Sequence, residues 1–254
     1  MRRDVRLLLS PEKNPFFDHG EAEYFIATAA GAVVGRIAAI DNRLHNETHA
    51  DRVGFFGFFE SVNDPAVATA LFASAAEWLR ARRFDTMRGP ASFSVNDECG
   101  LLVEGFDAPN TIMMPHNPRY YPALVEAAGL AGVKNLIAFQ GGDETRFVTP
   151  PERIVRAVAL PKERYGVTVR ALRLGDFAAE VERIKVLYNR CWEKNWGAIP
   201  MTDREIDHLA EQFRPVVNAN MVPFAEKEGV PVGFGLSLPD FNAALRSNRR
   251  GAMR

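Results

Sequence analysis

Two glutamates lie where predicted strands end and loops begin, and either could act as a general base. Glu60 ends an apolar strand, and Glu98 follows the end of a second one. A carboxylate becomes an effective base when burial raises its pKa. Cys99 is next to Glu98 but has no histidine nearby to activate it, so we expect a small buried side chain rather than a nucleophile.

A second polar cluster combines amides with an aromatic pair. His116 and Asn117 stand just before Tyr120 and Tyr121, and this group could contact a small polar ligand. Asn96, at a predicted strand end, joins the substrate-binding candidates. In the alternative interpretation Asn117 caps a helix and the two tyrosines pack its start. The sequence leaves both interpretations open.

Metal and disulfide chemistry are not expected. His45 and His49 are four residues apart, as in some metal sites, but they fall in a polar stretch without a glutamate after the first histidine. We therefore predict solvated histidines in a loop over residues 41–51. Cys99 and Cys191, the two cysteines, are far apart and form no Cys-x-x-Cys pair, so we expect neither a disulfide framework nor a zinc site.

Clear sequence patterns predict the strand and the helix that must position Glu60. Residues 53–60 carry paired phenylalanines, which favours a central strand buried on both faces. A helix is predicted over 65–83, with a polar cap and Pro65 at its first position. The positive end of such a helix suits the phosphates of a nucleotide-like cofactor, although an ordinary capped helix start explains the same pattern. The candidates at this junction are Ser61, Asn63, Asp64 and Ala66.

The other predicted elements divide the chain into two domains, 1–145 and 146–254, with the boundary marked by Gly-Gly and Pro-Pro pairs. In the first half we predict a hairpin over 23–40, a strand over 87–95, a helix over 120–128 and a strand over 134–139. In the second half we predict a strand over 167–172, helices over 176–196 and 203–213, and a hairpin over 221–238. The last strand would leave an unprotected sheet edge, through which a homo-oligomer could form.

Composition narrows the function classes. The chain has 31 basic and 32 acidic side chains and a net charge of −1, so it lacks the basic surplus that nucleic-acid binding needs. No apolar run approaches the roughly 18 residues of a membrane span. We therefore expect a cytoplasmic protein with no nucleic-acid or membrane partner.

The order hairpin, strand, helix, strand, helix, strand resembles the core of the GNAT-type acyl-CoA N-acyltransferase superfamily over about residues 20–140. The blocks similar to an uncharacterised tandem-GNAT group are NPFF at 14–17, GRIAA at 35–39, GFFGFFE at 54–60, GLLVEGFD at 100–107 and NPRYY at 117–121. The second half resembles only the opening half of that fold, and the first half lacks an obvious opening strand. The chain thus looks truncated at both ends. The resemblance implies an α+β fold, with a GNAT-like mixed central sheet flanked by helices and then a partial second unit.

The resemblance also implies an activity, transfer of an acyl group from acetyl-CoA or another acyl-CoA to a small-molecule amine or a peptide. Catalysis in that class is mostly positioning by the central strand, followed by removal of a proton. This would place Phe58 and Phe59, with the helix-start residues, against the cofactor. Glu60 or Glu98 would be the base.

Two departures from the family pattern keep a non-catalytic role open. The family's glycine-rich phosphate loop corresponds here to residues 61–70, which contain no glycine, and Asp64 adds a negative charge. The tyrosine that often acts as general acid corresponds to Val125. A GNAT-like binding or interaction domain, or an inactive fragment, is therefore the alternative to an enzyme.

Overall fold

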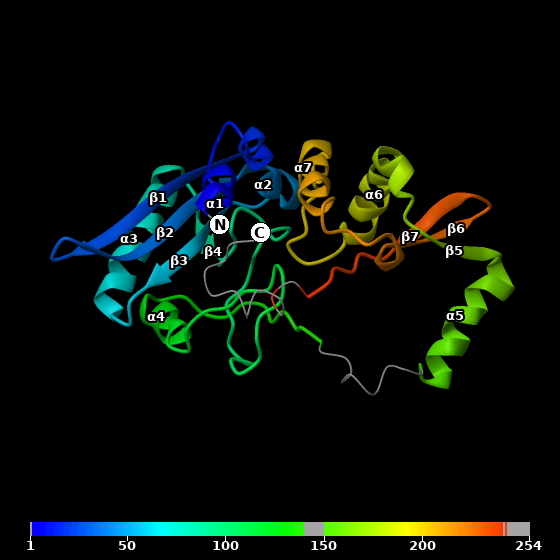
Figure 1. The fold of residues 1–254 in the computed structure, drawn as a ribbon. Helices are drawn as coiled ribbons and strands as arrows, with labels where there is room; N and C mark the ends of the chain where they lie inside the picture. Colours follow the sequence, from blue (N-terminus) through cyan, green and yellow to red (C-terminus); the bar gives the residue numbers. More distant parts are fainter. Residues whose placement is uncertain (1, 140–149, 241, 243–254) are drawn as a thin grey trace. The chain divides into compact units, whose positions relative to one another are not determined.

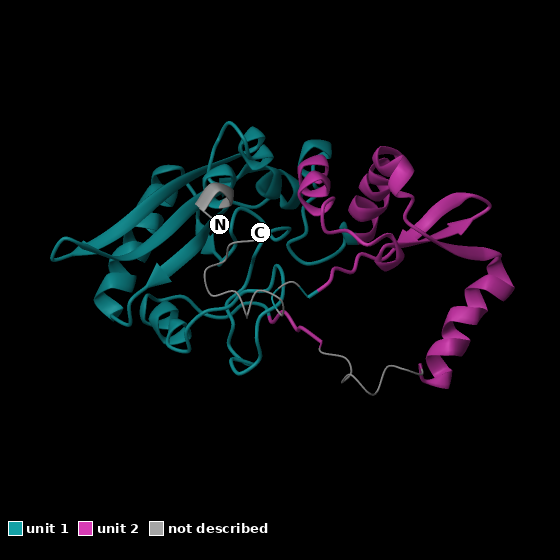
Figure 2. Cartoon of the chain, in the orientation of Figure 1, with its two compact units in different colours: residues 1–134, 192–205, 240–254 teal, residues 135–191, 206–239 magenta. Residues whose placement is uncertain are grey.

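The computed structural model describes residues 2–139, 150–240 and 242 of the 254-residue chain (Figure 1). The chain divides into two compact units (Figure 2). The first takes residues 1–134, 192–205 and 240–254, and the second takes 135–191 and 206–239. The predicted domain boundary at 145/146 lies outside the described residues and stays a prediction.

The first unit is built on a four-stranded mixed sheet. Its strands, in spatial order, are β1 (Gly20–Ala29), β2 (Ala32–Asn42), β3 (Val53–Ser61) and β4 (Thr86–Arg88). The first three pair antiparallel, whereas β3 and β4 pair parallel. Helices α3 (Pro65–Ala81) and α4 (Tyr121–Ala127) pack on one face (Figure 1). The predicted α+β class, with a mixed sheet flanked by helices, is confirmed.

The central strand β3 is buried on both faces, as its paired phenylalanines predict. One face packs against α3 and α4, and the other packs against the loop that follows β4. The cluster on the α3 face is Ile37, Ala39, Phe56, Phe59, Ala68, Leu71, Phe72, Ala75, Leu79, Tyr121 and Leu124. The cluster on the opposite face is Phe16, Ala38, Ile40, Val53, Phe55, Ala91 and Phe93. These two cores fix the position of the strand end that carries Glu60.

Helix α3 begins as predicted. Asp64 is its N-cap, and the Asp64 carboxylate accepts the backbone N–H of Ala66 at 2.8 Å. Pro65 occupies the first turn, where its missing N–H costs nothing. The buried side chains of α3 recur at steps of three and four residues, so the helix presents one apolar stripe to the sheet.

The predicted loop over 41–51 is wrong, because residues within it form helix α2 (Arg43–His49). Asn42 caps this helix by accepting the N–H of His45 at 3.0 Å. The His45 ring packs edge-on against Phe55, with ring centres 4.8 Å apart, and is only 2% exposed. The expectation of a solvated histidine is therefore wrong for His45, whose pKa is lowered by burial.

Two other predicted strands differ in the structure. The strand predicted over 87–95 is reduced to β4, because Pro90 has no N–H with which to continue the ladder. An isolated bridge between Ala91 and Cys99 follows. Residues 134–139 are described and form no strand. Two short helical segments, α1 (Arg2–Leu8) and the 3-10 helix η1 (Pro15–Asp18), precede the sheet in sequence.

The second unit holds a three-stranded antiparallel sheet, in the order β5 (Val167–Ala171), β6 (Pro223–Lys227), β7 (Val230–Phe234). It also contains α5 (Glu152–Tyr165), most of α6 (Phe177–Trp192) and most of α7 (Asp203–Phe213), with 3-10 helices η2 (Leu174–Asp176) and η3 (Ala219–Met221). The strand, two helices and hairpin predicted here are confirmed in order, whereas α5 is not predicted because Pro161 interrupts its pattern. Among the described residues β7 is an edge strand, and association through it stays a prediction. None of the described helices is both long and apolar enough to cross a membrane.

Candidate functional site

A cavity of about 250 Å³ opens where β3 and β4 separate. The parallel pairing ends at Phe55 and Arg88, and the N–H of Ala91 makes one more bond to the carbonyl of Phe56 at 2.8 Å. Beyond that point the chain after β4 leaves the sheet. The carboxyl ends of neighbouring parallel strands are where ligands usually bind in open sheets, so this position favours a binding site.

A β-bulge in β3 forms one wall of the cavity. Arg36 pairs with Glu60 and Ala38 pairs with Gly57, so β3 has one residue more than β2 between these pairs. Phe58 lies at the bulge with a left-handed φ of 50°. Bulges redirect side chains and are frequent beside active sites. Here Phe58 packs edge-on against Phe93, with ring centres 4.9 Å apart, and also lines the cavity.

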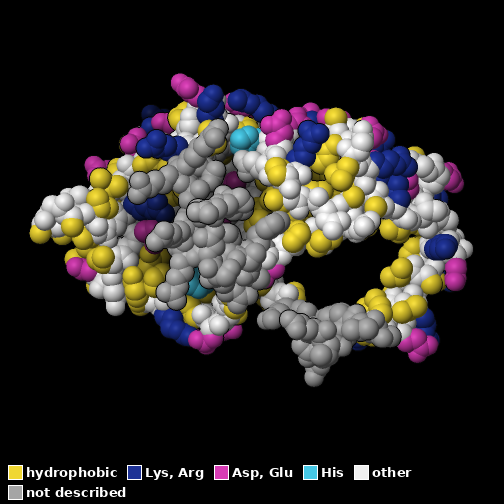
Figure 3. Space-filling model, in the orientation of Figure 1, with side chains coloured by type: hydrophobic (Ala, Val, Ile, Leu, Met, Phe, Trp, Pro, Cys, Tyr) yellow, Lys and Arg dark blue, Asp and Glu magenta, His cyan; other side chains and the backbone are white. Residues whose placement is uncertain are grey.

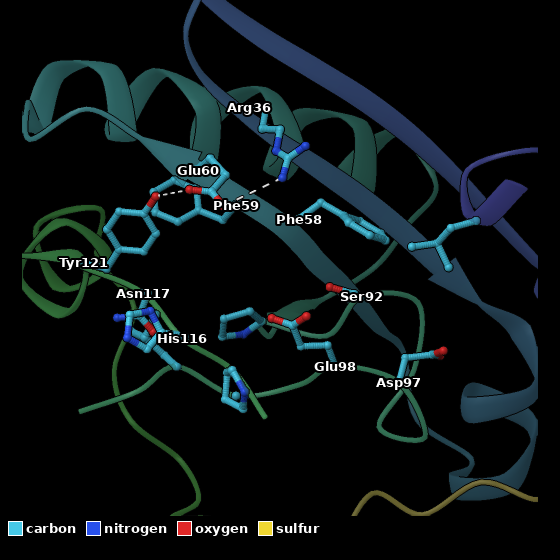
Figure 4. A pocket seen from close by; sticks show the side chains of 15 residues that line it. Arg36, Phe58, Phe59, Glu60, Ser92, Asp97, Glu98, His116, Asn117 and Tyr121 are labelled. Atoms are coloured by element: carbon cyan, nitrogen blue, oxygen red, sulfur yellow. Dashed lines mark hydrogen bonds and ion pairs between the residues drawn. The ribbon is translucent and has the colours of Figure 1, made fainter. Parts of the chain in front are cut away.

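The charged side chains of the wall are mainly acidic (Figure 4). Glu60, Asp97 and Glu98 line the cavity with Arg36 and His116. Partial desolvation by the surrounding protein raises the pKa of Glu98, and the nearby charge of Glu60 raises it further. Burial raises the pKa of Asp97 to about 6, although a hydrogen bond from Ser94 opposes the shift. Such a wall favours a cationic ligand and supplies carboxylates that can accept a proton.

Glu60 is held between two partners from different elements. The Tyr121 hydroxyl donates to its carboxylate at 2.5 Å, and the Arg36 guanidinium lies 3.7 Å away (Figure 4). The same Tyr121 oxygen accepts the backbone N–H of Ser61 at 3.1 Å, while Tyr120 donates to the Ser61 carbonyl at 2.9 Å. The start of α4 is thereby fastened to the end of β3. Burial and the bond to Glu60 raise the pKa of Tyr121, so it stays a protonated donor.

Asn117 has a structural task at the cavity edge. Its side-chain oxygen accepts the N–H of Leu102 at 2.8 Å, and its amide nitrogen donates to the carbonyls of Leu102 at 3.2 Å and Pro118 at 3.1 Å. The side chain is buried and its amide is occupied by these bonds. Asn117 therefore holds two loop segments together beside the exposed His116.

At the N-terminus of α3, a capping side chain of the protein itself occupies the position that a phosphate would take. Ala66 gives its N–H to Asp64, and Pro65 has none to give. These two positions offer no donors to a phosphate, so the residues there do not form the cradle that a CoA pyrophosphate would need. The geometry is that of an ordinary N-cap.

The structure brings about half of the predicted site together. The predicted residues that line the cavity are Phe58, Phe59, Glu60, Glu98, Asn117 and Tyr121. Those outside its lining are Ser61, Asn63, Asp64, Ala66, Asn96 and Tyr120. Asn96 instead donates to the carbonyl of Ile199 at 3.3 Å. The functional roles of all twelve residues stay predictions.

Two charged side chains of the lining were not predicted, Arg36 and Asp97. Asp97 lies between the predicted residues Asn96 and Glu98, so its place in this polar run was the feature of the sequence that could have predicted it. Arg36 reaches the site only through its register opposite Glu60, which no local pattern shows. Within the described residues, no group of three or more His, Cys, Asp or Glu side chains is placed to hold a metal ion.

Comparison with known proteins gives a relative for nearly the whole chain. No protein-family model matches the sequence, and no solved structure matches it. The chain is similar to a bacterial ceramide synthase. That relative, from Caulobacter vibrioides (strain NA1000 / CB15N), is 39% identical over 240 residues, which are 93% of this chain and 61% of the relative. Protein YghO from Escherichia coli (strain K12) is 34% identical over 234 residues, 92% of this chain and 59% of that protein.

The chain therefore spans less than two thirds of the length of the curated relatives it matches. The matched length exceeds either compact unit, so the similarity includes residues of both. Neither relative tests the resemblance to the GNAT superfamily, which stays a prediction.

Proposed function

We propose that this chain transfers an acyl group from acyl-CoA to the amine of a sphingolipid-like lipid, within a GNAT-like fold. The observation that carries the proposal is the acidic cavity at the separation of β3 and β4. The similarity to a protein named bacterial ceramide synthase supports the same chemistry. A ceramide is an amide between a fatty acid and a long-chain amino alcohol, so a site that makes one must receive an amine.

The reaction requires a base because the acceptor amine is protonated near neutral pH. A carboxylate takes one proton from the ammonium group, and the freed nitrogen lone pair attacks the thioester carbon. The C–N bond forms, the C–S bond breaks, and the nitrogen loses a second proton, which the departing CoA thiolate takes up. The first proton passes from the carboxylate to water, which restores the base. We assign the base to Glu98, because its raised pKa makes it more basic than an ordinary carboxylate and Figure 4 shows it pointing into the cavity.

Glu60 has a different proposed role. The Tyr121 hydroxyl and the Arg36 guanidinium fix its orientation, so it can hold the ammonium group beside Glu98. Phe58 and Phe59 would contact the acyl donor at the bulge. The helix-start set predicted for the cofactor has no part in this mechanism, because the Asp64 cap occupies that position.

The Asp64 cap also favours a second candidate, binding of a lipid amine without catalysis. A GNAT-like domain that has lost its phosphate site would keep the acidic cavity and bind the amine alone. The two candidates differ in one measurable property. Only the enzyme is stabilised by palmitoyl-CoA, by about 2.7 kcal/mol at 100 times its dissociation constant.

The test incubates the chain with palmitoyl-CoA and sphinganine, and measures the amide by mass spectrometry and the released thiol by colorimetry. Glu98→Gln should lower kcat/KM by about a hundredfold or more and remove the acidic limb of the pH profile. Glu104→Gln is the matched control, because Glu104 is an exposed carboxylate on the following loop and does not line the cavity.

Loss of activity in both variants, or in neither, contradicts the assignment of Glu98. No amide from the parent chain, combined with stabilisation by sphinganine but not by palmitoyl-CoA, supports binding without catalysis.

A further inference from the structure

Helix α5 has no buried side chain along its whole length. It runs from Glu152 to Tyr165, 14 residues, and ends at Gly166, whose left-handed backbone leads into β5. All of its residues except Ala159 and Pro161 are exposed in the part of the chain that the structure describes. A helix of this length is marginal in water by itself, and packing of an apolar face is the usual source of its stability. Among residues 2–139, 150–240 and 242, this helix therefore has no partner that buries an apolar face of it.

The exposed apolar side chains of α5 gather on one side. Ile154, Val155, Val158 and Tyr165 lie within about 100° of one another around the axis, at 3.6 residues per turn. They are 48%, 53%, 66% and 57% exposed. Figure 3 shows apolar atoms along one side of α5 and charged groups along the other. We call these four residues the α5 stripe.

The charges of α5 are mainly positive. Its basic residues are Arg153, Arg156, Lys162 and Arg164, and its acidic residues are Glu152 and Glu163, so four positive charges face two negative ones. One exposed ion pair joins Arg156 to Glu152 at 2.7 Å. The whole chain has a net charge of −1, so the positive excess of this helix does not reflect the overall composition.

We infer that α5 docks the protein on an anionic lipid surface, with the α5 stripe at the acyl-chain boundary and the basic side chains among the head groups. An exposed apolar stripe beside a basic polar face is the pattern of helices that lie in a membrane interface. Lys162 lies on the stripe side, and its aliphatic stem lets the ammonium reach the head groups. The positive excess favours an anionic lipid surface, rather than a second copy of α5, as the partner of the stripe, because two such helices would repel each other.

A second exposed apolar segment belongs to the same unit. Leu136, Ile137 and Phe139 precede α5 in sequence and are exposed. The expectation of no membrane partner rested on the lack of a spanning run, and the near-neutral net charge gave no sign of a basic surface. Neither property detects an interfacial helix, so this inference revises that expectation.

The experiment mixes the full chain with vesicles of equimolar phosphatidylcholine and phosphatidylglycerol, and measures the bound fraction by sedimentation. Val158→Asp places a charge in the α5 stripe. Leu160→Asp is the matched control, because Leu160 is also exposed, at 47%, but lies about 200° round the helix from Val158. Both variants change the net charge by the same amount. Leu160 lies one turn from Arg156 and Arg164, so any loss of binding from its new charge works against the expected difference rather than producing it.

We expect Val158→Asp to bind about tenfold more weakly than Leu160→Asp. We also expect the parent chain to bind pure phosphatidylcholine vesicles more weakly, and to be released from the mixed vesicles by salt. Equal binding by the two variants, or no sedimentation of the parent, overturns the inference. A dimer in size-exclusion chromatography that only Val158→Asp disrupts also overturns it, in favour of a second copy.

This assay involves no acyl transfer, so its outcome is separate from that of the proposed function. Since α5 buries none of its side chains, both variants should melt at the parent temperature. Acyl transfer to a short-chain, water-soluble amine should also be equal in all three proteins if the proposed function holds.

Discussion

Replacement of Tyr121 by phenylalanine tests how the cavity wall is held. The Tyr121 hydroxyl accepts the N–H of Ser61 and donates to Glu60, and both Tyr121 and Ser61 are buried. Tyr121→Phe keeps the ring and its packing against Phe59. The substitution therefore removes two hydrogen bonds and almost no apolar contact.

The expected cost comes mainly from Ser61. A buried N–H left without a partner costs about 1–3 kcal/mol. The Glu60 side chain is 57% exposed, so water can replace the lost hydroxyl and this bond adds little. We expect Tyr121→Phe to lower the free energy of unfolding of the first unit by about 1–2 kcal/mol, or its melting temperature by roughly 3–6 °C.

Tyr120→Phe is the matched control. Tyr120 donates to the carbonyl of the same residue, Ser61, and a carbonyl oxygen tolerates the loss of one donor better than a buried N–H tolerates the loss of its acceptor. Its expected cost is about 0.5 kcal/mol. Tryptophan fluorescence is the assay, because Trp78, Trp192 and Trp196 all belong to the first unit. If the two variants melt together, the assignment of the cost to the Ser61 N–H is refuted.

Two further predictions concern the same wall. Asp97 binds protons more tightly in the folded than in the unfolded state, so its contribution to stability is present below pH 3.8 and is lost as the pH rises through about 6. Asp97→Asn should therefore stabilise the protein at pH 7, by up to about 3 kcal/mol, and have little effect at pH 3.5; urea unfolding at the two values checks this, and equal effects would contradict it. Gly57→Ala would place a methyl group 2.2 Å from the carbonyl oxygen of Ala91, and should cost about 2 kcal/mol or more in the same unfolding assay. Gly132→Ala, with no neighbouring atom within 4 Å, is the control, and an equal loss there would reject the steric explanation.

Those parts of the site that depend on neighbours in sequence could be predicted. The buried strand β3 follows from its paired phenylalanines, and the start of α3 follows from a capping residue placed before Pro65. Glu60 was found because it ends the apolar run of β3, and Glu98 because it follows a predicted strand that the structure shortens to β4. A carboxyl end of a strand is a property that a local pattern can reveal.

The features that local sequence patterns did not predict depend on contacts with residues elsewhere in the chain. His45 is buried because α2 places its ring against Phe55, ten residues later, and polar composition alone favoured a loop. The cap at Asn42 was the one local signal for that helix. The role of Asn117 is similar, since its amide binds the backbone of Leu102 rather than its own helix. The sequence allows both uses of that amide, and only the fold decides between them.

The face of the sheet on which Glu60 lies depends on the one extra residue that the bulge inserts into β3. In a regular strand Phe56, Phe58 and Glu60 would point to the same side, toward α3, because side chains alternate with a period of two. The bulge breaks this alternation, so Phe56 and Phe59 pack on the α3 face and Phe58 joins the opposite face. Glu60 consequently lies opposite Arg36 and lines the cavity.

The trace of this bulge in the sequence is the three-residue spacing of Phe56 and Phe59, where two strand residues on one face should be two or four apart. The paired phenylalanines were interpreted as a strand buried on both faces, which is correct, but their spacing also contains the register change. The acidic wall of the cavity thus arises from an irregularity in β3 that supplies Glu60 and from a loop after β4 that supplies Asp97 and Glu98. Neither source alone would bring all three carboxylates to this strand separation, and so the acidic wall is a property of the fold.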